Sequence, residues 1–421
     1  MYLCLFEDAH VRHLYPLALT RAAGDLRVGA HTLFGRLCRH FEADGVVLHT
    51  RGLVAGVTRH EHAGALVNEL PEETGGVLML NQRYLPEPGP LLDRLRAAAA
   101  SGEPACAFRQ GDTVVAAWLP SPQPDLLGAD AIGGWHFEGV PEERVEGARL
   151  VSRLWHLNEG VEEQITRDLE ALAQWGQEGA TVEEGAHLIY PNRIKLGEGA
   201  VVRTGAIISA ANGPVALAAG AEVHERAVVR GPCIIGPKAK VLVAGRVEGS
   251  AIGPVSKVGG EVHASVVHSY SNKAHDGYLG DSYLGRWCNL GADANTSNLK
   301  NDYGEVSLWD AVAEDFVGTG RQFCGLFMAD HSKCSINAMF NTGTVVGVSC
   351  NLFGAGFPPR YIPSFSWGGA DGLVEYRLEK ALRVAEAVMA RRDLPLTDAD
   401  REMLTAVFEH SADARAAVAE A

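Results

Sequence analysis

A six-residue spacing of apolar residues dominates the second half of the chain. Five residues follow it without interruption: Val223, Val229, Ile235, Val241 and Val247. Further on, six residues fall on one lattice of the same period, with Gln322 as the exception: Phe316, Met328, Cys334, Phe340, Val346 and Leu352. This period fits neither a helix, which repeats about every 3.6 residues, nor a strand, which alternates with period two.

Hexapeptide repeats of this kind build a parallel β-helix, in which three repeats make one coil and one apolar residue of each repeat points inward. The alternative is a sandwich of short strands, but sandwich strands recur about every 8–12 residues and alternate with period two. The sequence therefore predicts a β-helix over 181–360. The lattice is interrupted near 248–275 and 299–315, where we expect loops to leave the β-helix.

Two helical segments follow the repeats. Segment 371–392 is amphipathic, and segment 397–410 begins with a threonine N-cap signal. The apolar face of the first segment holds Leu378, Leu382, Ala385 and Val388. We expect this tail, over 361–421, to cover the open end of the β-helix and its unpaired strand edge.

The first 150 residues predict an α/β domain, joined to the repeats by a linker helix over 151–180. Three short apolar segments predict buried strands: YLCLF, GVVLHT and GVLMLN. Leu33, Leu37 and Phe41 share one helical face after Thr32, a residue type that caps helices. A hairpin is expected to turn at Gly111-Asp112. A Pro/Gly-rich segment covers 121–134.

Charge and composition restrict the classes of function. The chain has 421 residues and a formal net charge of −15, which argues against a nucleic-acid partner. No apolar run reaches the roughly 18–20 residues of a membrane span, and the start lacks the features of a signal peptide. Eight cysteines are scattered without C-x-x-C spacing. We therefore expect a cytoplasmic protein with reduced cysteines and no membrane partner.

Polar residues interrupt the repeat between 271 and 300. The segment HDGYLGD over 275–281 is followed by NLGA over 289–292. This motif and its spacing resemble the acetyltransferase half of the GlmU family, which combines glucosamine-1-phosphate acetyltransferase with UDP-N-acetylglucosamine pyrophosphorylase. The whole chain resembles a GlmU-like branch with a short N-terminal domain. The resemblance implies a left-handed β-helix that forms a homotrimer, with active sites between subunits.

The resemblance also implies roles for individual residues. Acetyl transfer from a thioester to an amine needs a base, and histidine changes its protonation in the useful pH range. His275 matches the family's base, and Asn289 matches the amide that orients the amine or polarises the thioester carbonyl. Tyr278 matches a residue that contacts the sugar phosphate, and Ala292 matches a position whose backbone meets acetyl-CoA. Beside these matches, we expect Lys273 and Asn298 at the sugar substrate and Asn295 at acetyl-CoA. The structural alternatives are a solvated surface histidine and asparagines stacked in a ladder.

One departure from the family pattern lies at His263, where the pattern has a lysine twelve residues before the base. His263 is therefore assigned to the substrate, and the acceptor can be a nucleotide sugar or another amino sugar. His263 and His268 also have the H-x4-H spacing with which γ-class carbonic anhydrases bind zinc on this fold. A third ligand is needed, and His224 is three residues out of register. The metal-dependent hydratase is therefore the weaker interpretation, and no metal is assigned.

The N-terminal domain lacks the usual pyrophosphorylase signature. There is no glycine pair after the first strand, although Thr20, Arg21, Asp25 and Arg27 can form a divergent nucleotide-binding loop or a salt-bridged structural turn. Where the family places a metal-binding aspartate, the chain has Asn81. We expect Mg²⁺ only if this domain is active.

The expected function is an acetyl-CoA-dependent acetyltransferase that acts on an amino-sugar phosphate or a nucleotide-linked amino sugar. Its N-terminal domain is then a degenerate nucleotidyltransferase that binds or positions a nucleotide sugar. The alternative is a bifunctional or mainly nucleotide-transferring enzyme. A non-catalytic scaffold is the third interpretation.

Overall fold

The computed structural model describes residues 1–71, 75–100, 104–121, 139–171 and 179–419. The chain divides into two compact units. The first comprises Met1–Leu26, His31–Leu154 and Thr397–Met403; the second comprises Arg27–Ala30, Trp155–Leu396 and Leu404–Ala421. Nearly all of the Pro/Gly-rich segment 121–134 and the last residues of the predicted linker helix lie outside the described residues.

The first unit contains a mixed sheet with the strand order β5-β4-β1-β6-β8-β7-β9. The three predicted strands form its parallel centre, with β1 (Tyr2–Phe6) between β4 (Gly45–His49) and β6 (Val77–Asn81). The others are β5 (Leu66–Val67), β7 (Cys106–Gln110), β8 (Thr113–Leu119) and β9 (Glu142–Arg144). The helices are α1 (Leu33–Cys38), α2 (Gly52–Glu61) and α3 (Pro90–Ala100). This is the predicted α/β domain.

Two local predictions for this unit are confirmed. The Thr32 side chain accepts a hydrogen bond from the Gly35 N–H at 3.1 Å and caps α1. Strands β7 and β8 are antiparallel and Gln110 pairs with Thr113, so the chain turns at Gly111-Asp112.

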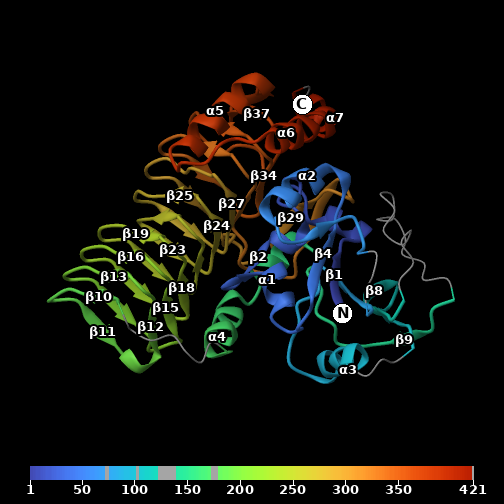
Figure 1. Ribbon diagram of the computed structural model, residues 1–421. Coiled ribbons are helices and arrows are strands. Elements are labelled where there is room, and N and C mark those ends of the chain that lie inside the picture. Colours follow the sequence, from blue (N-terminus) through green and yellow to red (C-terminus); the bar gives the residue numbers. More distant parts are fainter. Residues whose placement is uncertain (72–74, 101–103, 122–138, 172–178, 420–421) are drawn as a thin grey trace. The chain divides into compact units, whose positions relative to one another are not determined.

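The second unit is a left-handed parallel β-helix with three sheets (Figure 1). The β25 sheet contains β10 (Thr181–Val182), β13 (Val201–Val202), β16 (Glu222–Val223), β19 (Lys240–Val241), β22 (Lys257–Val258) and β25 (Asn272–Lys273). The β26 sheet contains β11 (His187–Ile189), β14 (Ile207–Ser209), β17 (Val228–Arg230), β20 (Arg246–Glu248), β23 (Glu261–His263) and β26 (Tyr278–Gly280).

The third sheet, named the β27 sheet, is the longest of the three. Its strands are β12 (Ile194–Leu196), β15 (Val215–Leu217), β18 (Cys233–Ile235), β21 (Ala251–Ile252), β24 (Val266–Ser269), β27 (Tyr283–Arg286), β31 (Leu326–Met328), β34 (Thr344–Val346) and β36 (Tyr361–Ile362). Helix α4 (Val161–Ala171), within the predicted linker, lies beside β18 (Figure 1).

The predicted lattice is the core of this β-helix. Val223, Val229, Ile235, Val241 and Val247 are buried in one continuous apolar cluster. The same cluster contains Met328, Cys334, Phe340, Val346 and Leu352. Phe316 is the exception: it lies in β30 (Asp315–Gly318), which forms an antiparallel hairpin with β29 (Ser307–Asp310) outside the repeat. This hairpin belongs to the loop that was predicted to leave the β-helix near 299–315.

The prediction that a loop leaves the β-helix near 248–275 is wrong. Glu222 pairs with Lys240, Lys240 with Lys257 and Lys257 with Asn272, so successive coils contain 18, 17 and then 15 residues. The turns become shorter while the parallel ladders continue. The inward residues therefore leave the six-residue period without leaving the β-helix.

The outer end of the β-helix continues the predicted lattice through Cys334, Phe340 and Leu352, and adds a hairpin over 366–375 that the sequence patterns did not predict. In line with the β25 sheet lie β32 (Lys333–Cys334), β35 (Asn351–Leu352) and β37 (Ser366–Gly369), with β38 (Gly372–Glu375) antiparallel to β37. A small additional sheet pairs β28 (Asn295–Thr296) with β33 (Met339–Phe340). The hairpin of β37 and β38 therefore ends this sheet, and α7 (Ala412–Ala419) lies against β38.

Helix α5 (Leu378–Ala390) follows the hairpin and α6 (Asp398–His410) comes next. The residues that α5 buries are Ala381, Ala385 and Met389, whereas Leu378, Leu382 and Val388 are only partly buried. The predicted N-cap of α6 is confirmed, because the Thr397 hydroxyl accepts from the Asp400 N–H at 3.1 Å. Among the described residues, no helix is both long enough and apolar enough to span a membrane.

Candidate active site

A column of polar side chains runs along the outer face of the β25 sheet and its continuation. Parallel pairing places Lys257, Asn272, Asn289, Lys333, Asn351 and Trp367 one above the next. Leu290, Cys334 and Leu352 follow three of these residues and are buried in the core, so their predecessors face outward. The column is therefore a ladder of one outward residue per coil, spaced by about 4.8 Å.

Helix α5 and the residues just after it cover part of this ladder and enclose a cavity of about 430 Å³. The cavity is lined by Lys257, Tyr270, Asn272, Ala274, His275, Trp287, Cys288, Asn289, Lys333, Val388, Arg391 and Arg392. The rings of Tyr270 and Trp287 are stacked, with their centroids 4.4 Å apart, and form an aromatic wall. This volume lies within the range of small-molecule sites, about 300–1,000 Å³.

The cavity is positively charged. Lys257, Lys333, Arg391 and Arg392 line it, and its lining includes no carboxylate. In the described part of the chain, no ion pair joins any of these four residues to an acidic partner. Burial, with the nearby charge of Arg392, lowers the pKa of Lys257, and burial lowers the pKa of Lys333 to about 8. Such a site suits an anionic ligand.

The structure brings His275 and Asn289, the two predicted catalytic residues, to this cavity. His275 is exposed on the turn between β25 and β26, and Asn289 lies on the next coil. The Asn272 amide nitrogen is 3.5 Å from the Asn289 Oδ1, at the outer limit of a hydrogen bond. A tight asparagine ladder therefore does not hold Asn289, and its amide can reach a ligand.

Cys288 has no part in a covalent mechanism. Its side chain belongs to the core, as predicted, and its Sγ lies 3.2 Å from the carbonyl oxygen of Ala329. Burial raises the pKa of this thiol to about 12, so the thiolate does not form near neutral pH. All eight cysteines are free of disulfide bonds.

Lys273 is a correction to the predicted substrate contacts. Its side chain points into the β-helix and is 1% exposed. The ammonium group donates to the carbonyl oxygens of Gly259 at 3.1 Å, His275 at 2.6 Å and Asp276 at 3.0 Å. It therefore holds the turn that carries His275 from the inside and does not reach an external phosphate.

Tyr278, Asn295 and Asn298 form a separate hydrogen-bond network. Asn298 donates from Nδ2 to the Tyr278 hydroxyl at 3.1 Å and to Asp281 at 2.7 Å. Asn295 accepts from the Tyr278 N–H at 2.9 Å. Burial raises the pKa of Tyr278. The cavity lining does not include Tyr278, Asn295 or Asn298.

The other two predicted residues lie near this network. His263 ends β23 and pairs with Gly280 of β26. Ala292 accepts a backbone hydrogen bond from Asn337 at 2.8 Å. His268 is buried and hydrogen-bonded through Nδ1 to Ser269 at 3.0 Å. Within the described residues, neither His263 nor His268 belongs to a group of three metal-ligating side chains.

In the first unit, the predicted nucleotide loop is held as a structural turn. Arg51 pairs with Glu7 at 3.0 Å and donates to the carbonyl oxygens of Ala18 and Arg21, both at 2.8 Å. Thr20 and Arg21 are buried within this turn. Arg27 belongs to the second unit, where its Nε donates to the carbonyl oxygen of His268 at 3.2 Å. Arg51 thus closes the turn around Thr20 and Arg21, and Arg27 is hydrogen-bonded within the second unit.

Asp25 has a different setting. Its carboxylate is 2.8 Å from His62 Nε2, and its ligand atom lies within 4.8 Å of those of Glu61 and His62. Two carboxylates and an imidazole suit a transition metal better than Mg²⁺, which prefers oxygen ligands alone.

Asp8, two residues after the end of β1, forms an ion pair with Arg83. Arg83 contacts its two carboxylate oxygens at 2.8 and 2.5 Å, and Asn81 donates to it at 2.9 Å. Burial by itself would raise the pKa of Asp8, but the hydrogen bonds and charge of Arg83 outweigh it and lower the pKa. Asn81, at the position where an aspartate was expected, thus supports the ion pair between Asp8 and Arg83.

Comparisons with known proteins agree with this fold. The family model described as sugar nucleotidyl transferase matches residues 3–175. The chain is 29% identical over 120 residues to the bifunctional protein GlmU of Methanococcus aeolicus, covering 28% of this chain and 25% of that protein. It is 29% identical over 153 residues to GlmU of Azoarcus sp., covering 34% and 31%. These matches span about a quarter to a third of the curated relatives.

Solved structures of UDP-N-acetylglucosamine acyltransferases also match. The Arabidopsis protein has 14% identity and a TM-score of 0.21, covering 51% of this chain and 78% of that chain. The Francisella novicida protein has 12% identity and a TM-score of 0.24, covering 56% and 87%. Scores this low carry no argument about the chemistry.

The likeness to the GlmU family inferred from the 275–292 motif is confirmed: residues 3–175 match a sugar nucleotidyl transferase model, and parts of the chain match GlmU proteins. Sequence patterns missed Lys257, Lys333, Arg391 and Arg392. These residues are separated by up to 135 positions, and only the ladder register and the return of α5 bring them together.

Proposed function

We propose that the second unit is an acyltransferase that moves an acetyl group from acetyl-CoA to the amine of a phosphorylated or nucleotide-linked amino sugar. One observation carries the proposal. His275 and Asn289 face one cavity of about 430 Å³, together with four basic side chains and no carboxylate. A base, a neutral hydrogen-bond donor and an anion site are the parts that this reaction needs.

The chemistry follows from these positions. The amine nitrogen attacks the thioester carbonyl carbon, so that a C–N bond forms and the C–S bond breaks. His275 accepts the proton that the nitrogen loses, and the departing sulfur takes up a proton and leaves as the free thiol. Asn289 donates from its amide to the developing oxyanion or holds the amine. No protein nucleophile is required, in agreement with the buried thiol of Cys288.

The basic residues give the acceptor its place. Lys257, Arg391 and Arg392 contact the acceptor phosphate, and the wall of Tyr270 and Trp287 stacks on its sugar ring or base. Phosphate contacts fix the acceptor, so the amine lies next to His275 without mobile loops. Positioning of this kind supplies a large part of the acceleration in two-substrate reactions.

Tyr278, Asn295 and Asn298 lie on the neighbouring face of the β-helix. In the homotrimer that the family resemblance implies, we propose that a neighbouring copy brings such a network to the cavity. Tyr278 and Asn298 then contact the acceptor, His263 assists them, and Ala292 and Asn295 contact the donor.

The first unit favours a second candidate activity, because residues 3–175 match the sugar nucleotidyl transferase family. A bifunctional enzyme that also forms a nucleotide sugar is therefore the alternative. The ion pair of Asp8 with Arg83 and the turn held by Arg51 favour a domain that binds nucleotide sugar and turns it over slowly. Any Mg²⁺ requirement belongs to this activity.

A substrate panel tests the main proposal. Amino-sugar 1-phosphates and UDP- or dTDP-linked amino sugars are incubated with acetyl-CoA, and free thiol is measured. Thiol release that depends on one acceptor is expected. Release of pyrophosphate from UTP or dTTP and a sugar 1-phosphate, without any thiol release, would support the alternative instead.

A further inference from the structure

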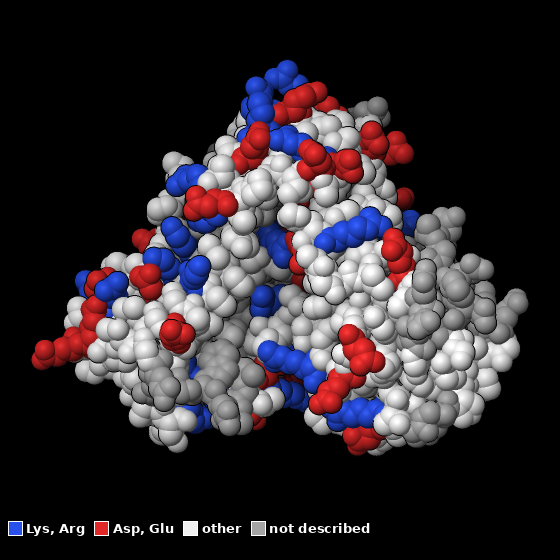
Figure 2. Space-filling model, in the orientation of Figure 1, with Lys and Arg blue, Asp and Glu red and all other residues white. Residues whose placement is uncertain are grey.

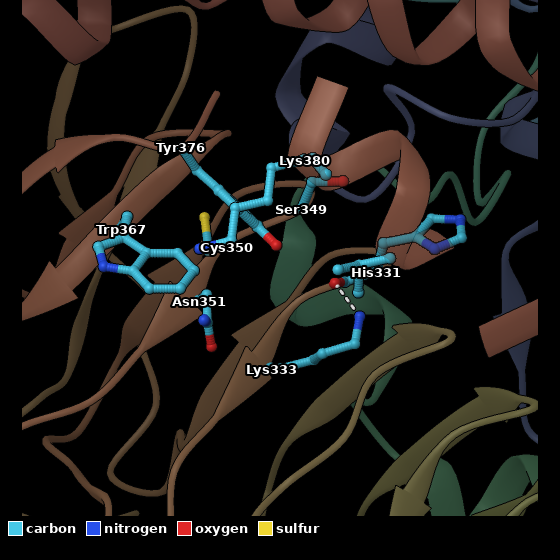
Figure 3. A pocket seen from close by; sticks show the side chains of 10 residues that line it. His331, Lys333, Ser349, Cys350, Asn351, Trp367, Tyr376 and Lys380 are labelled. Carbon is cyan, nitrogen blue, oxygen red and sulfur yellow. Dashed lines mark hydrogen bonds between the residues drawn. The ribbon is translucent and has the colours of Figure 1, made fainter. Parts of the chain in front are cut away.

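Lys333 lies where two spaces meet. It lines the cavity of about 430 Å³ that His275 and Asn289 also line, and it lines a second pocket of about 170 Å³ (Figure 3). Helix α5 contributes Val384 to the pocket and Val388 to the cavity, so both spaces lie between this helix and the ladder. The mechanism above leaves Lys333 without a task.

The Lys333 side chain is partly buried, and its ammonium group has hydrogen-bonding capacity to spare. It donates one hydrogen bond of 2.8 Å to the carbonyl oxygen of His331, as Figure 3 shows. Among the residues that the structure describes, this ammonium has no other hydrogen-bond acceptor and no acidic partner. An ammonium group carries three donors, so two remain for a ligand.

We propose that Lys333 is the acid of the acyl transfer, and that its ammonium donates a proton to the sulfur of CoA as the C–S bond breaks. The inference rests on the proposed function and adds a catalytic residue to it. His275 takes one proton from the attacking nitrogen, and Lys333 supplies one proton to the departing sulfur. The products are the amide and the free thiol, and exchange with solvent returns both side chains to their starting forms.

The order of residues along the ladder places Lys333 on the side of the leaving group. Lys257 lies two steps before Asn289, and Lys333 lies one step after it. The proposed acceptor phosphate binds at Lys257, so the amine approaches the carbonyl at Asn289 from that side. The sulfur is bonded to the same carbon and departs on the other side, within about one step of 4.8 Å toward Lys333. The flexible four-carbon stem of a lysine spans such a distance.

The second pocket provides space for the rest of the donor. It continues from Lys333 along the next two ladder residues, Asn351 and Trp367. Lys380 of α5 lines the pocket as well, with its ammonium 3.8 Å from the centre of the Trp367 ring. A chain attached to the sulfur can therefore leave the cavity past Lys333, and this path keeps the sulfur beside the ammonium.

The acidity of this ammonium fits the task. A thiol of the cysteine type has a pKa of about 8.5, whereas an ordinary lysine has a pKa of about 10.4 and retains its proton against such a thiolate. Burial lowers the pKa of Lys333 to about 8. Near neutral pH the group is mostly protonated, and proton transfer to the sulfur is close to balanced. An acid catalyst works best when its pKa lies near the operating pH.

The test varies the acidity of the leaving thiol. The thiol of S-acetyl-N-acetylcysteamine, a truncated form of acetyl-CoA, needs a proton, whereas the thiolate of S-acetyl nitrothiophenol leaves without one near neutral pH. Lys333→Met should lower kcat/KM for acetyl-CoA and for the cysteamine thioester by about 10²–10⁴, the usual loss when an acid or base is removed. The kcat/KM for the nitrothiophenyl thioester, corrected for the uncatalysed reaction, should change little.

Two further variants complete the comparison. Lys257→Met is the matched control, because it removes the same type of side chain from the acceptor side of the same cavity. It should weaken acceptor binding by the same factor with either thioester. Lys333→Arg keeps the positive charge but does not release its proton, so its acetyl-CoA activity should fall as in Lys333→Met. It also serves as the second variant if Lys333→Met does not fold.

The outcomes are distinct. Equal losses with both thioesters in a folded Lys333→Met protein overturn the inference and leave the proposed function intact. Full acetyl-CoA activity in Lys333→Arg also overturns it, because charge without proton transfer is then sufficient. A wild-type protein that releases no thiol from acetyl-CoA with any acceptor removes the proposed function, and the inference with it.

Discussion

The ammonium group of Lys273, inside the β-helix, donates a hydrogen bond of 2.6 Å to the backbone carbonyl of His275 on the outer edge. The same ammonium contacts the carbonyl of Asp276 at 3.0 Å. A residue at a core position thus fixes the turn of the proposed base. Coils on either side hold this turn, so His275 is carried on a rigid element, as an acid–base group requires.

The first prediction concerns this buried lysine and pH. Burial lowers the pKa of Lys273 to about 8, against about 10.4 in an unfolded chain. Below pH 8 both states are protonated and the burial penalty is present in full; between pH 8 and 10 the native state binds fewer protons, so stability rises with pH. Relative to Lys273→Met, the wild type should gain up to about 1.4 kcal/mol of unfolding free energy per pH unit in this range.

Urea unfolding of both proteins at pH 7, 8, 9 and 9.5 measures this difference. The comparison cancels the many groups that titrate equally in the two proteins. A difference in unfolding free energy that stays constant over these pH values would contradict the burial of a titrating ammonium at position 273.

The second prediction concerns the basic wall of the cavity. Figure 2 shows Lys and Arg side chains interspersed with Asp and Glu along the side of the β-helix, whereas the cavity lining holds basic residues and no carboxylate, in a chain with a net charge of −15. Removal of Arg391 and Arg392 together should raise KM for a phosphorylated acceptor by about 10–100-fold, because each loses a charge-assisted hydrogen bond. kcat should change little.

Arg383→Ala, on α5 and outside the cavity, is the control and should leave KM unchanged. Steady-state kinetics at two salt concentrations separate direct contact from general attraction, because screening weakens the latter. Equal effects of the double variant and the control would exclude a specific phosphate site.

The sequence predicts the β-helix well wherever one apolar residue recurs every six positions, as from Val223 to Val247. The prediction fails between 248 and 275 because the coils shorten to 15 residues and the period changes while the hydrogen-bonded ladders persist. A pattern with a fixed period cannot detect coils whose turns vary in length.

The candidate site was predictable only in part. His275 and Asn289 belong to one motif, so their spacing was enough to bring them together. Lys273 looked like a surface cation because nothing in the motif shows that it replaces a core residue opposite Val258. The basic wall depends on α5 crossing the ladder, and no local pattern encodes that tertiary contact.

The third prediction concerns the first unit. Because Arg83 forms an ion pair with Asp8 and the turn at 18–25 is closed by Arg51, we expect little pyrophosphate release from UTP or dTTP and a sugar 1-phosphate. Nucleotide-sugar binding should be measurable by calorimetry. Robust pyrophosphate release that Arg21→Ala or Arg27→Ala abolishes would overturn this view.

The fourth prediction is a homotrimer, as the family resemblance implies. Four large apolar side chains in segment 336–357 are between 38% and 66% exposed: Ile336, Met339, Phe353 and Phe357. We predict that these side chains are covered in the trimer, since large exposed apolar surface marks interaction sites. Light scattering at micromolar concentration should give the mass of three chains, and Ile336→Asp should shift it toward one chain. A wild-type monomer would contradict the composite site.

The most direct measurement of the central claim is thiol release by His275→Ala. Removal of a general base typically lowers the rate by about 10²–10⁴, and loss of an oxyanion donor in Asn289→Ala by about 10²–10³. The account predicts that His275→Ala keeps the oligomeric state and melting temperature of the wild type and loses most of its acyl transfer. Full thiol-releasing activity in an intact His275→Ala protein would contradict it.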